Sequence, residues 1–95
     1  MKLTNVGYGN MVATQRIVAV VAPDSAPVRR LIQETREAGR IIDATAGRKT
    51  RAVLVLDSGH AVLSPLQPET LTGRILERPE RPAQKETEGM RADND

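Results

Sequence analysis

The residues best suited to bind a ligand form one short basic stretch, Gly47-Arg48-Lys49-Thr50-Arg51, which leads directly into the apolar residues 52–56. Its arginines carry forked N–H donors that match the oxygens of phosphate groups, and its lysine adds a compact positive charge. The glycine permits backbone conformations in which main-chain amides can join the same contact. The stretch therefore predicts an anion site on a loop held by a strand, although a solvated hairpin turn would also accommodate these residues.

Two further side chains are candidates for function, and a purely structural role fits each of them as well. Arg16 opens another apolar stretch after a polar turn, and it either lies beside the basic stretch or marks the edge of a strand. Tyr8, which stands between two glycines, could stack on a ligand or donate a hydrogen bond. The sequence alone does not decide between these alternatives.

Signatures of catalysis and of metal binding are missing from the sequence. It has no GxSxG motif, no GxxxxGK[ST] motif and no cysteine for nucleophilic chemistry. His60 is the only histidine, so a zinc site within one chain is not expected. We therefore expect a protein that is not an enzyme and that uses no metal and no small-molecule cofactor.

The distribution of apolar residues divides the chain into two parts. Residues 1–76 hold all 22 Val, Ile and Leu residues and carry ten Arg or Lys against six Asp or Glu, a net charge of +4. Residues 77–95 hold none of these apolar residues and have a net charge of −2, a composition typical of a disordered tail. We expect one basic domain, suited to a polyanion partner, followed by a charged tail. No apolar run reaches the ~20 residues of a membrane helix, which favours a cytoplasmic protein without a membrane partner.

Periodicity predicts a small α+β domain with a mainly antiparallel sheet. An apolar stripe at helical spacing predicts one long helix between Ser25 and Gly39, and a short helix is expected from Pro68 to about Leu76. Residues 11–15 show no clear period. The expected element order is ββαβββα, with strands at residues 2–7, 16–22, 40–45, 51–56 and 61–64.

Two features of this domain predict self-association. Its core is small and contains one Tyr but no Phe or Trp, and domains of this size often gain stability from partner subunits. The strands expected at residues 17–22 and 52–56 are apolar on both faces. In an antiparallel sheet the second face must then be covered, either by the other helix or by a neighbouring subunit.

Several blocks of the chain stand in the order and spacing of one known family. These blocks are Asn5-Val-Gly-Tyr-Gly-Asn-Met-Val12, Arg16-Ile-Val-Ala-Val-Val21, Pro23-Asp-Ser-Ala-Pro27, Ile42-Asp-Ala-Thr45, Gly47-Arg-Lys-Thr-Arg-Ala-Val53 and Gln67-Pro-Glu-Thr70. With them the chain closely resembles the RemA family of bacterial regulators of extracellular matrix genes. The resemblance extends over residues 1 to about 76 and does not include the tail.

The resemblance implies a DNA-binding transcriptional regulator of matrix or biofilm genes, associated with the nucleoid. Its subunits would assemble into a ring-shaped homo-oligomer that holds double-stranded DNA largely by the backbone. By position, the functional arginines of the family fall on Arg16 and on the pair Arg48 and Lys49, and Arg51 also matches. Lys49 departs from the commoner second arginine, and it keeps the charge but loses the forked geometry.

The leading hypothesis is therefore multivalent DNA binding by a ring. The alternative is a protein-binding or assembly module whose basic loop contacts acidic partners. An RNA ligand fits less well, because one tyrosine offers little surface for stacking on single strands.

Overall fold

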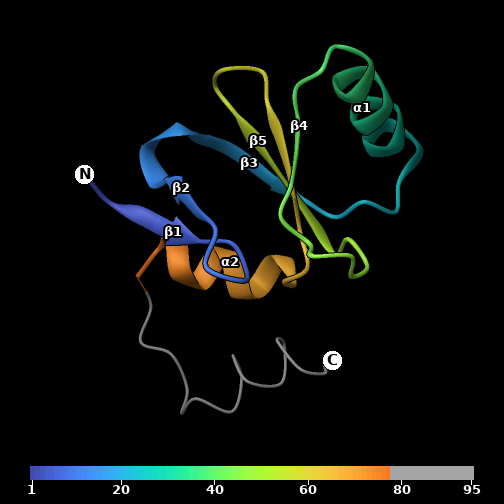
Figure 1. Ribbon diagram of the computed structural model, residues 1–95. Helices are drawn as coiled ribbons and strands as arrows, with labels where there is room; N and C mark the ends of the chain where they lie inside the picture. The colour runs from blue at the N-terminus through green and yellow to red at the C-terminus, as the bar shows by residue number, and fades with distance from the viewer. Residues whose placement is uncertain (78–95) are drawn as a thin grey trace.

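The computed structural model describes residues 1–77, which form a four-stranded sheet with a helix on each side and a separate two-stranded sheet (Figure 1). In chain order the elements are β1 (Leu3–Asn5), β2 (Met11–Ala13), the 3-10 helix η1 (Thr14–Arg16), β3 (Ile17–Val21), α1 (Ala26–Glu37), β4 (Ile41–Asp43), β5 (Ala52–Leu56), β6 (Ala61–Ser64) and α2 (Pro68–Ile75). Within residues 1–77 neither helix has the length and apolarity needed to cross a bilayer. Of the expected tail, only Glu77 belongs to the described residues, and its carboxylate lies 2.7 Å from the Lys2 ammonium.

Helix α1 follows from local capping and from its apolar stripe. The Ser25 hydroxyl accepts a hydrogen bond from the Val28 backbone N–H at 3.3 Å, which satisfies one of the unpaired amides of the first turn. Pro27 lies in that first turn, where its missing N–H costs nothing. Gly39 follows the helix with a φ of +73° and donates to the Arg36 carbonyl. The long helix predicted from the sequence is thus confirmed.

The four-stranded sheet has the order β3-β5-β6-β4. β5 pairs antiparallel with both β3 and β6, whereas β4 lies parallel to β6. The α+β class and the mainly antiparallel sheet are therefore confirmed. Residues 1–77 contain one strand more than expected, because Met11–Ala13 pairs antiparallel with Leu3–Asn5. Residues 11–15 show no clear period, and the pairing of β2 depends on the turn that brings it back against β1, which is why the sequence did not reveal this strand.

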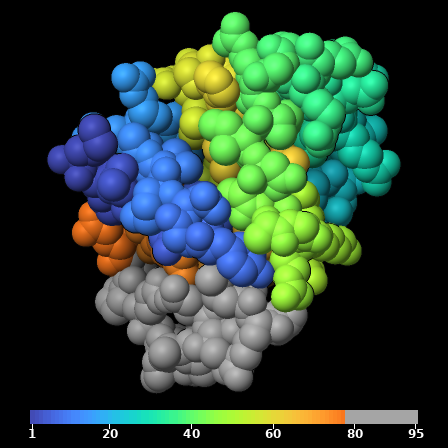
Figure 2. Space-filling view, in the orientation of Figure 1, coloured from blue at the N-terminus to red at the C-terminus, as the bar shows by residue number. Residues whose placement is uncertain are grey.

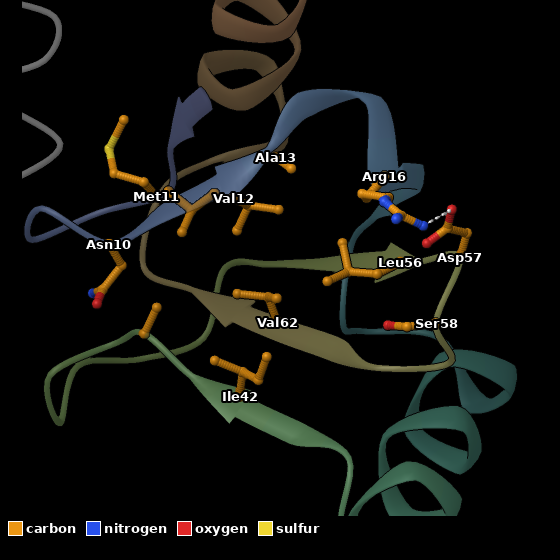
Figure 3. A pocket seen from close by; sticks show the side chains of 12 residues that line it. Asn10, Met11, Val12, Ala13, Arg16, Ile42, Leu56, Asp57, Ser58 and Val62 are labelled. Carbon is orange, nitrogen blue, oxygen red and sulfur yellow. Dashed lines mark hydrogen bonds and ion pairs between the residues drawn. The ribbon is translucent and has the colours of Figure 1, made fainter. Parts of the chain in front are cut away.

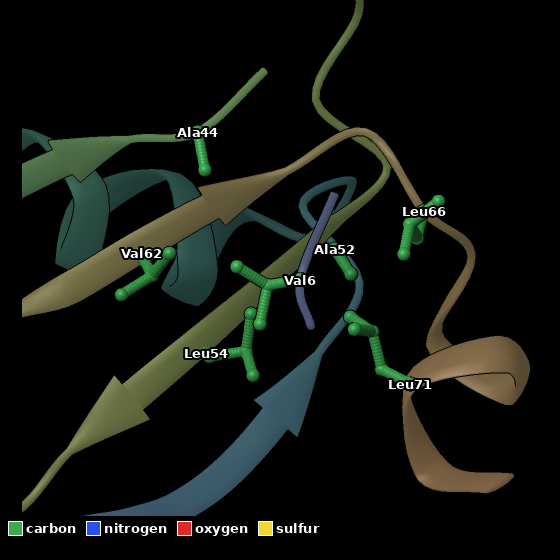
Figure 4. Packing of buried hydrophobic residues seen from close by; sticks show 7 residues of the cluster. All are labelled: Val6, Ala44, Ala52, Leu54, Val62, Leu66 and Leu71. Carbon is green, nitrogen blue, oxygen red and sulfur yellow. The ribbon is translucent and has the colours of Figure 1, made fainter. Parts of the chain in front are cut away.

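The apolar residues on the two faces of β5 pack into two separate clusters. On one face, Val53 packs with β6 residues and with the apolar stripe of α1. On the other face, Leu54 packs with Leu71 of α2 and with Val6, which follows β1 (Figure 4). The cover expected for the second face of this strand thus comes from within the chain. β3 differs at Val18, where the pairing register shifts and the side chain is 67% exposed.

Candidate nucleic-acid interface

The basic loop, residues 45–51, begins at a hydrogen-bonded turn after β4. Thr45 donates both its hydroxyl and its backbone N–H to the Asp43 carboxylate, at 2.6 and 2.9 Å. These two hydrogen bonds, with a smaller contribution from the charge of Arg36, hold the pKa of Asp43 below its ordinary value of 3.8. The carboxylate is therefore ionised at neutral pH and fixes the direction in which the loop leaves the sheet.

A tight turn then carries the chain to the cationic side chains. Ala46 and Gly47 have φ values of +54° and +81°, and the Arg48 backbone N–H donates to the Thr45 carbonyl at 3.0 Å. Two consecutive positive φ values are typical of a type I′ turn. Glycine adopts this conformation without strain, and an alanine does not. The turn projects residues 48 and 49 away from the sheet, where both are exposed.

Both ends of the basic loop are anchored in the core. Ala44 before it and Ala52 after it are buried in the cluster that contains Val6. The Arg51 backbone N–H donates to the Ser64 carbonyl at 2.8 Å, which ties the end of the loop to β6. A rigid sheet thus presents a short loop whose ends cannot move independently.

The cationic side chains of the loop have no partner within the part of the chain that the structure describes. Arg48, Lys49 and Arg51 are all exposed, and none forms an ion pair or a side-chain hydrogen bond with residues 1–77. Some arginines elsewhere on the surface do have a partner; the Arg29 guanidinium on α1, for example, donates to the Asp24 carbonyl at 2.9 Å. Three unpartnered cations on one anchored loop are suited to bind an anion from outside the chain.

Arg16 does not lie beside the basic loop. It precedes Ile17, which pairs with Leu56 at the far end of β5, whereas the loop enters β5 at Ala52. A strand rises about 3.3 Å per residue, so the six steps from Arg51 to Asp57, whose backbone N–H donates to the Arg16 carbonyl, separate the two groups by roughly 20 Å. The four residues singled out in the sequence therefore form two groups at opposite ends of one strand.

The guanidinium of Arg16 already has a partner, the Asp57 carboxylate at 3.1 Å. Both side chains are largely exposed, and such pairs contribute little to stability because water competes for both charges. The pair orients the guanidinium without neutralising it strongly, so that an external phosphate can still contact its remaining N–H donors.

A groove of about 460 Å³ extends along one face of the molecule between β2 and β4 (Figure 3). The middle of the groove is lined by apolar side chains: Val12 of β2, Ile42 of β4, Leu56 of β5 and Val62 of β6. Arg16 lies at one end of the groove (Figure 3). Figure 2 shows the hollow between the blue N-terminal hairpin and the green segment of residues 40–45. Sequence reasoning missed this groove, because it is formed by elements that are distant in the chain.

Titratable side chains do not converge in a manner that indicates catalysis. The Ser58 hydroxyl and His60 Nδ1 share a hydrogen bond of 2.7 Å at the β5–β6 turn, but both lie on an exposed tip. Among residues 1–77 no side chain or carbonyl bonds the other imidazole nitrogen to orient it, as a catalytic base requires. The same residues contain no group of three acidic, His or Cys side chains that could hold a metal ion.

Comparison with known proteins places most of the described chain in one family. The sequence model of the RemA-like family, described as extracellular matrix regulatory protein A-like, matches residues 3–75. A "putative regulatory protein" of Synechococcus elongatus is 60% identical over 74 residues, which cover 78% of this chain and 85% of the relative. A protein with the same description in Geobacillus kaustophilus is 56% identical, over 79% of this chain and 86% of the relative. Another, in Bacillus cereus, is 55% identical, over 84% of this chain and 92% of the relative.

Proposed function

The chain belongs to the RemA-like family of regulatory proteins, and we propose that it regulates transcription by holding duplex DNA through its backbone as a ring-shaped homo-oligomer. The observation that carries this proposal is the basic loop, an anchored turn with three exposed cations that no described residue neutralises. Phosphate groups at fixed spacing along DNA are the polyanion that such a surface fits. The residues proposed to bind DNA are Arg16, Arg48, Lys49 and Arg51.

Contact with the backbone, rather than with base edges, is favoured by the shape of the cationic elements. Base readout in the major groove commonly uses a helix that presents several side chains along one face. Here three of the four cations proposed to bind DNA lie on a loop of seven residues, and the outer face of α1 mixes acidic and basic side chains. A loop of this size can reach phosphates on either side of a groove, and selection would then depend on the deformability of the DNA.

Self-association explains how two separated groups could act on one DNA molecule. One copy offers Arg16 at one end of β5 and the basic loop at the other, roughly 20 Å away. In a head-to-tail assembly each contact repeats around the ring, and a closed rotation limits growth. Each subunit adds a weak phosphate site, and sites held at fixed spacing gain affinity through effective concentration. Apolar side chains left open on the surface, Met11 at 50% and Ile42 at 46% exposure, are available for contacts between copies.

The test is salt-dependent binding of duplex DNA by matched variants. Arg48→Ala is expected to weaken binding at least several-fold, and the slope of log affinity against log salt should fall by about 0.9 for each phosphate that a subunit no longer neutralises. Arg30→Ala removes the same charge from the outer face of α1 and is expected to bind as the unmodified protein does. Light scattering should give the same multimeric mass for all three proteins. Equal affinity of the Arg48 and Arg30 variants would overturn the assignment.

A competition experiment separates this function from the alternative of a module that contacts acidic proteins. Labelled duplex DNA on the protein is challenged with unlabelled duplex, single-stranded RNA and an acidic peptide of matched charge. Duplex DNA is expected to displace the probe at the lowest concentration, because its two strands present phosphates at a density that a flexible peptide does not match. Displacement by the peptide at an equal or lower concentration would favour the alternative.

A further inference from the structure

The turn between β1 and β2, residues 7–10, lies at the same end of the molecule as the basic loop. Val6, which leads into this turn, packs in one cluster with Ala44 and Ala52, the residues that flank the loop (Figure 4). The backbone of Gly7 lies close to Pro65, where an added Cβ would come within 2.9 Å of the ring. In Figure 2 the blue surface of this turn borders the yellow-green surface of the loop. Two separate turns thus present one continuous surface.

The turn is rigid without any contribution from the side chain of Tyr8. The backbone N–H and the side-chain amide of Asn10 both donate to the Gly7 carbonyl, at 2.9 and 2.8 Å. The Val6 N–H donates to the Asn10 carbonyl at 2.8 Å and closes the turn from the other side. These contacts all come from the backbone and from Asn10. The phenol is therefore not needed to hold the turn together.

Tyr8 occupies an unfavourable backbone conformation and an exposed position. Its φ is +53°, in the left-handed region that residues other than Gly, Asn and Asp seldom adopt. The residue is 40% exposed, and no described residue forms a hydrogen bond with its hydroxyl. The chain has no other Tyr and no Phe or Trp. Glycine or asparagine would suit this turn better, so the ring is retained at a cost to folding, which is common at binding sites.

We propose that Tyr8 is a further DNA-contacting residue, whose phenol O–H donates to a phosphate oxygen of duplex DNA while its ring packs on the adjoining deoxyribose. This inference rests on the proposed function and adds a neutral contact beside the cations of Arg48 and Lys49. Tyrosine hydroxyls are among the groups that position proteins on the sugar–phosphate backbone. The hydrogen-bonded turn fixes the backbone of Tyr8, so binding requires no ordering of the loop.

The first experiment compares binding of a 30-base-pair duplex by two tyrosine variants. Tyr8→Phe removes only the hydroxyl and should weaken binding about twofold to tenfold, and Tyr8→Gly should weaken it further because the ring is also lost. Neither variant should change the salt slope, because the side chain is neutral, whereas Lys49→Ala should reduce the slope. Tyr8→Gly relieves the left-handed strain, so its Tm should equal or exceed that of the unmodified protein. Gln33→Ala, on the outer face of α1, serves as the control.

The second experiment uses the fact that the chain has a single tyrosine. Protein labelled with 3-fluorotyrosine gives one ¹⁹F NMR signal, which reports only on residue 8. Duplex DNA should shift or broaden this signal in proportion to saturation, and added salt should reverse the change as the DNA dissociates. The signal of Arg48→Ala should respond only at higher DNA concentrations.

The outcomes separate this inference from the proposed function. If the unmodified protein does not bind duplex DNA, the proposed function fails, and this inference fails with it. If the protein binds DNA and Arg48→Ala weakens binding, but both tyrosine variants bind normally and the ¹⁹F signal does not move, only the role of Tyr8 is overturned. A loss of affinity in Tyr8→Gly together with a lower Tm and a lower multimeric mass would also overturn it, since the ring would then be structural.

Discussion

The hydroxyl of Ser64 donates to the backbone carbonyl of Val6 at 2.7 Å and joins the end of β6 to the start of the β1–β2 turn. The backbone carbonyl of Ser64 accepts the Arg51 N–H that ends the basic loop. One fully buried serine thus links the two turns to the same strand. This connection explains why the two turns share a surface although they are distant in the sequence.

Replacing Ser64 with alanine should destabilise the fold by about 1–3 kcal/mol. The substitution removes the hydrogen bond to Val6 and also the one that the Leu66 N–H donates to the serine hydroxyl at 3.1 Å, and it leaves two buried backbone groups without a partner. Urea unfolding followed by circular dichroism, at one protein concentration, measures the change. Ser58→Ala removes a hydroxyl at an exposed turn and should change stability by less than about 0.5 kcal/mol. Equal effects of the two substitutions would show that the buried bond is unimportant.

Alanine at Gly7 should be far more harmful than alanine at Gly9, although both glycines have positive φ values. At Gly7 the φ is +123°, and a new Cβ would lie 2.9 Å from two ring carbons of Pro65. At Gly9 the φ is +78° and nothing lies within 4 Å of such a Cβ. The cost at Gly9 should be near the ~1 kcal/mol of a left-handed alanine, and the cost at Gly7 should be at least about 2 kcal/mol. Thermal unfolding of both variants tests the order, which a smaller loss at Gly7 would contradict.

The sequence predicted those elements whose signals are local. The helix α1 has a cap, a stripe and a terminal glycine close together in the chain, and the β5–β6 hairpin has two apolar runs around one polar turn. The parallel pairing of β4 with β6 depends on the path of the chain between them, which leaves no local signature. The covered second face of β5 was expected, but only the fold shows that α2, α1 and the residue after β1 supply the cover.

The arrangement of the candidate site could be predicted only in part. Arg48 and Lys49 are neighbours in sequence, so their proximity was certain once they were placed on one loop. The position of Arg16 depends on the antiparallel register that pairs Ile17 with Leu56, and register is set by long-range packing. The sequence identified Tyr8 as a candidate, but only the folded structure reveals its positive φ and its position beside the basic loop.

The stability of the basic loop should depend on pH through Asp43. Its pKa in the folded protein lies below the ordinary value of 3.8, chiefly because Thr45 donates two hydrogen bonds to the carboxylate. Because the pKa of Asp43 is lower in the folded protein than in the unfolded chain, ionised Asp43 stabilises the folded state fully above about pH 4. This contribution is lost as the pH falls through the pKa that Asp43 has in the folded protein. Asp43→Asn keeps the turn geometry but cannot titrate, so it should be less stable at pH 7 and should lose less stability between pH 4 and pH 2.

Urea unfolding of both proteins across pH 2–7 measures this difference. The contribution of Glu77, whose pKa is lowered by its hydrogen bond and ion pair with Lys2, is present in both proteins, and the difference between the two curves isolates residue 43. Parallel curves over the acid range would show that the two hydrogen bonds do not favour the ionised form.

Under the proposed function, Lys49→Arg should strengthen DNA binding, because a forked guanidinium replaces a compact ammonium at a proposed phosphate contact. The side chain is exposed and has no partner among residues 1–77, so a longer guanidinium meets no obstacle there. Both residues carry one positive charge, and the salt slope should therefore stay unchanged. The forked donors of arginine can bind a phosphate through two hydrogen bonds, for which we expect a severalfold gain in affinity. Gel-shift titrations at two salt concentrations measure both quantities, with Arg30→Lys as the converse exchange on α1. An unchanged affinity for Lys49→Arg would mean that this position acts as a point charge alone.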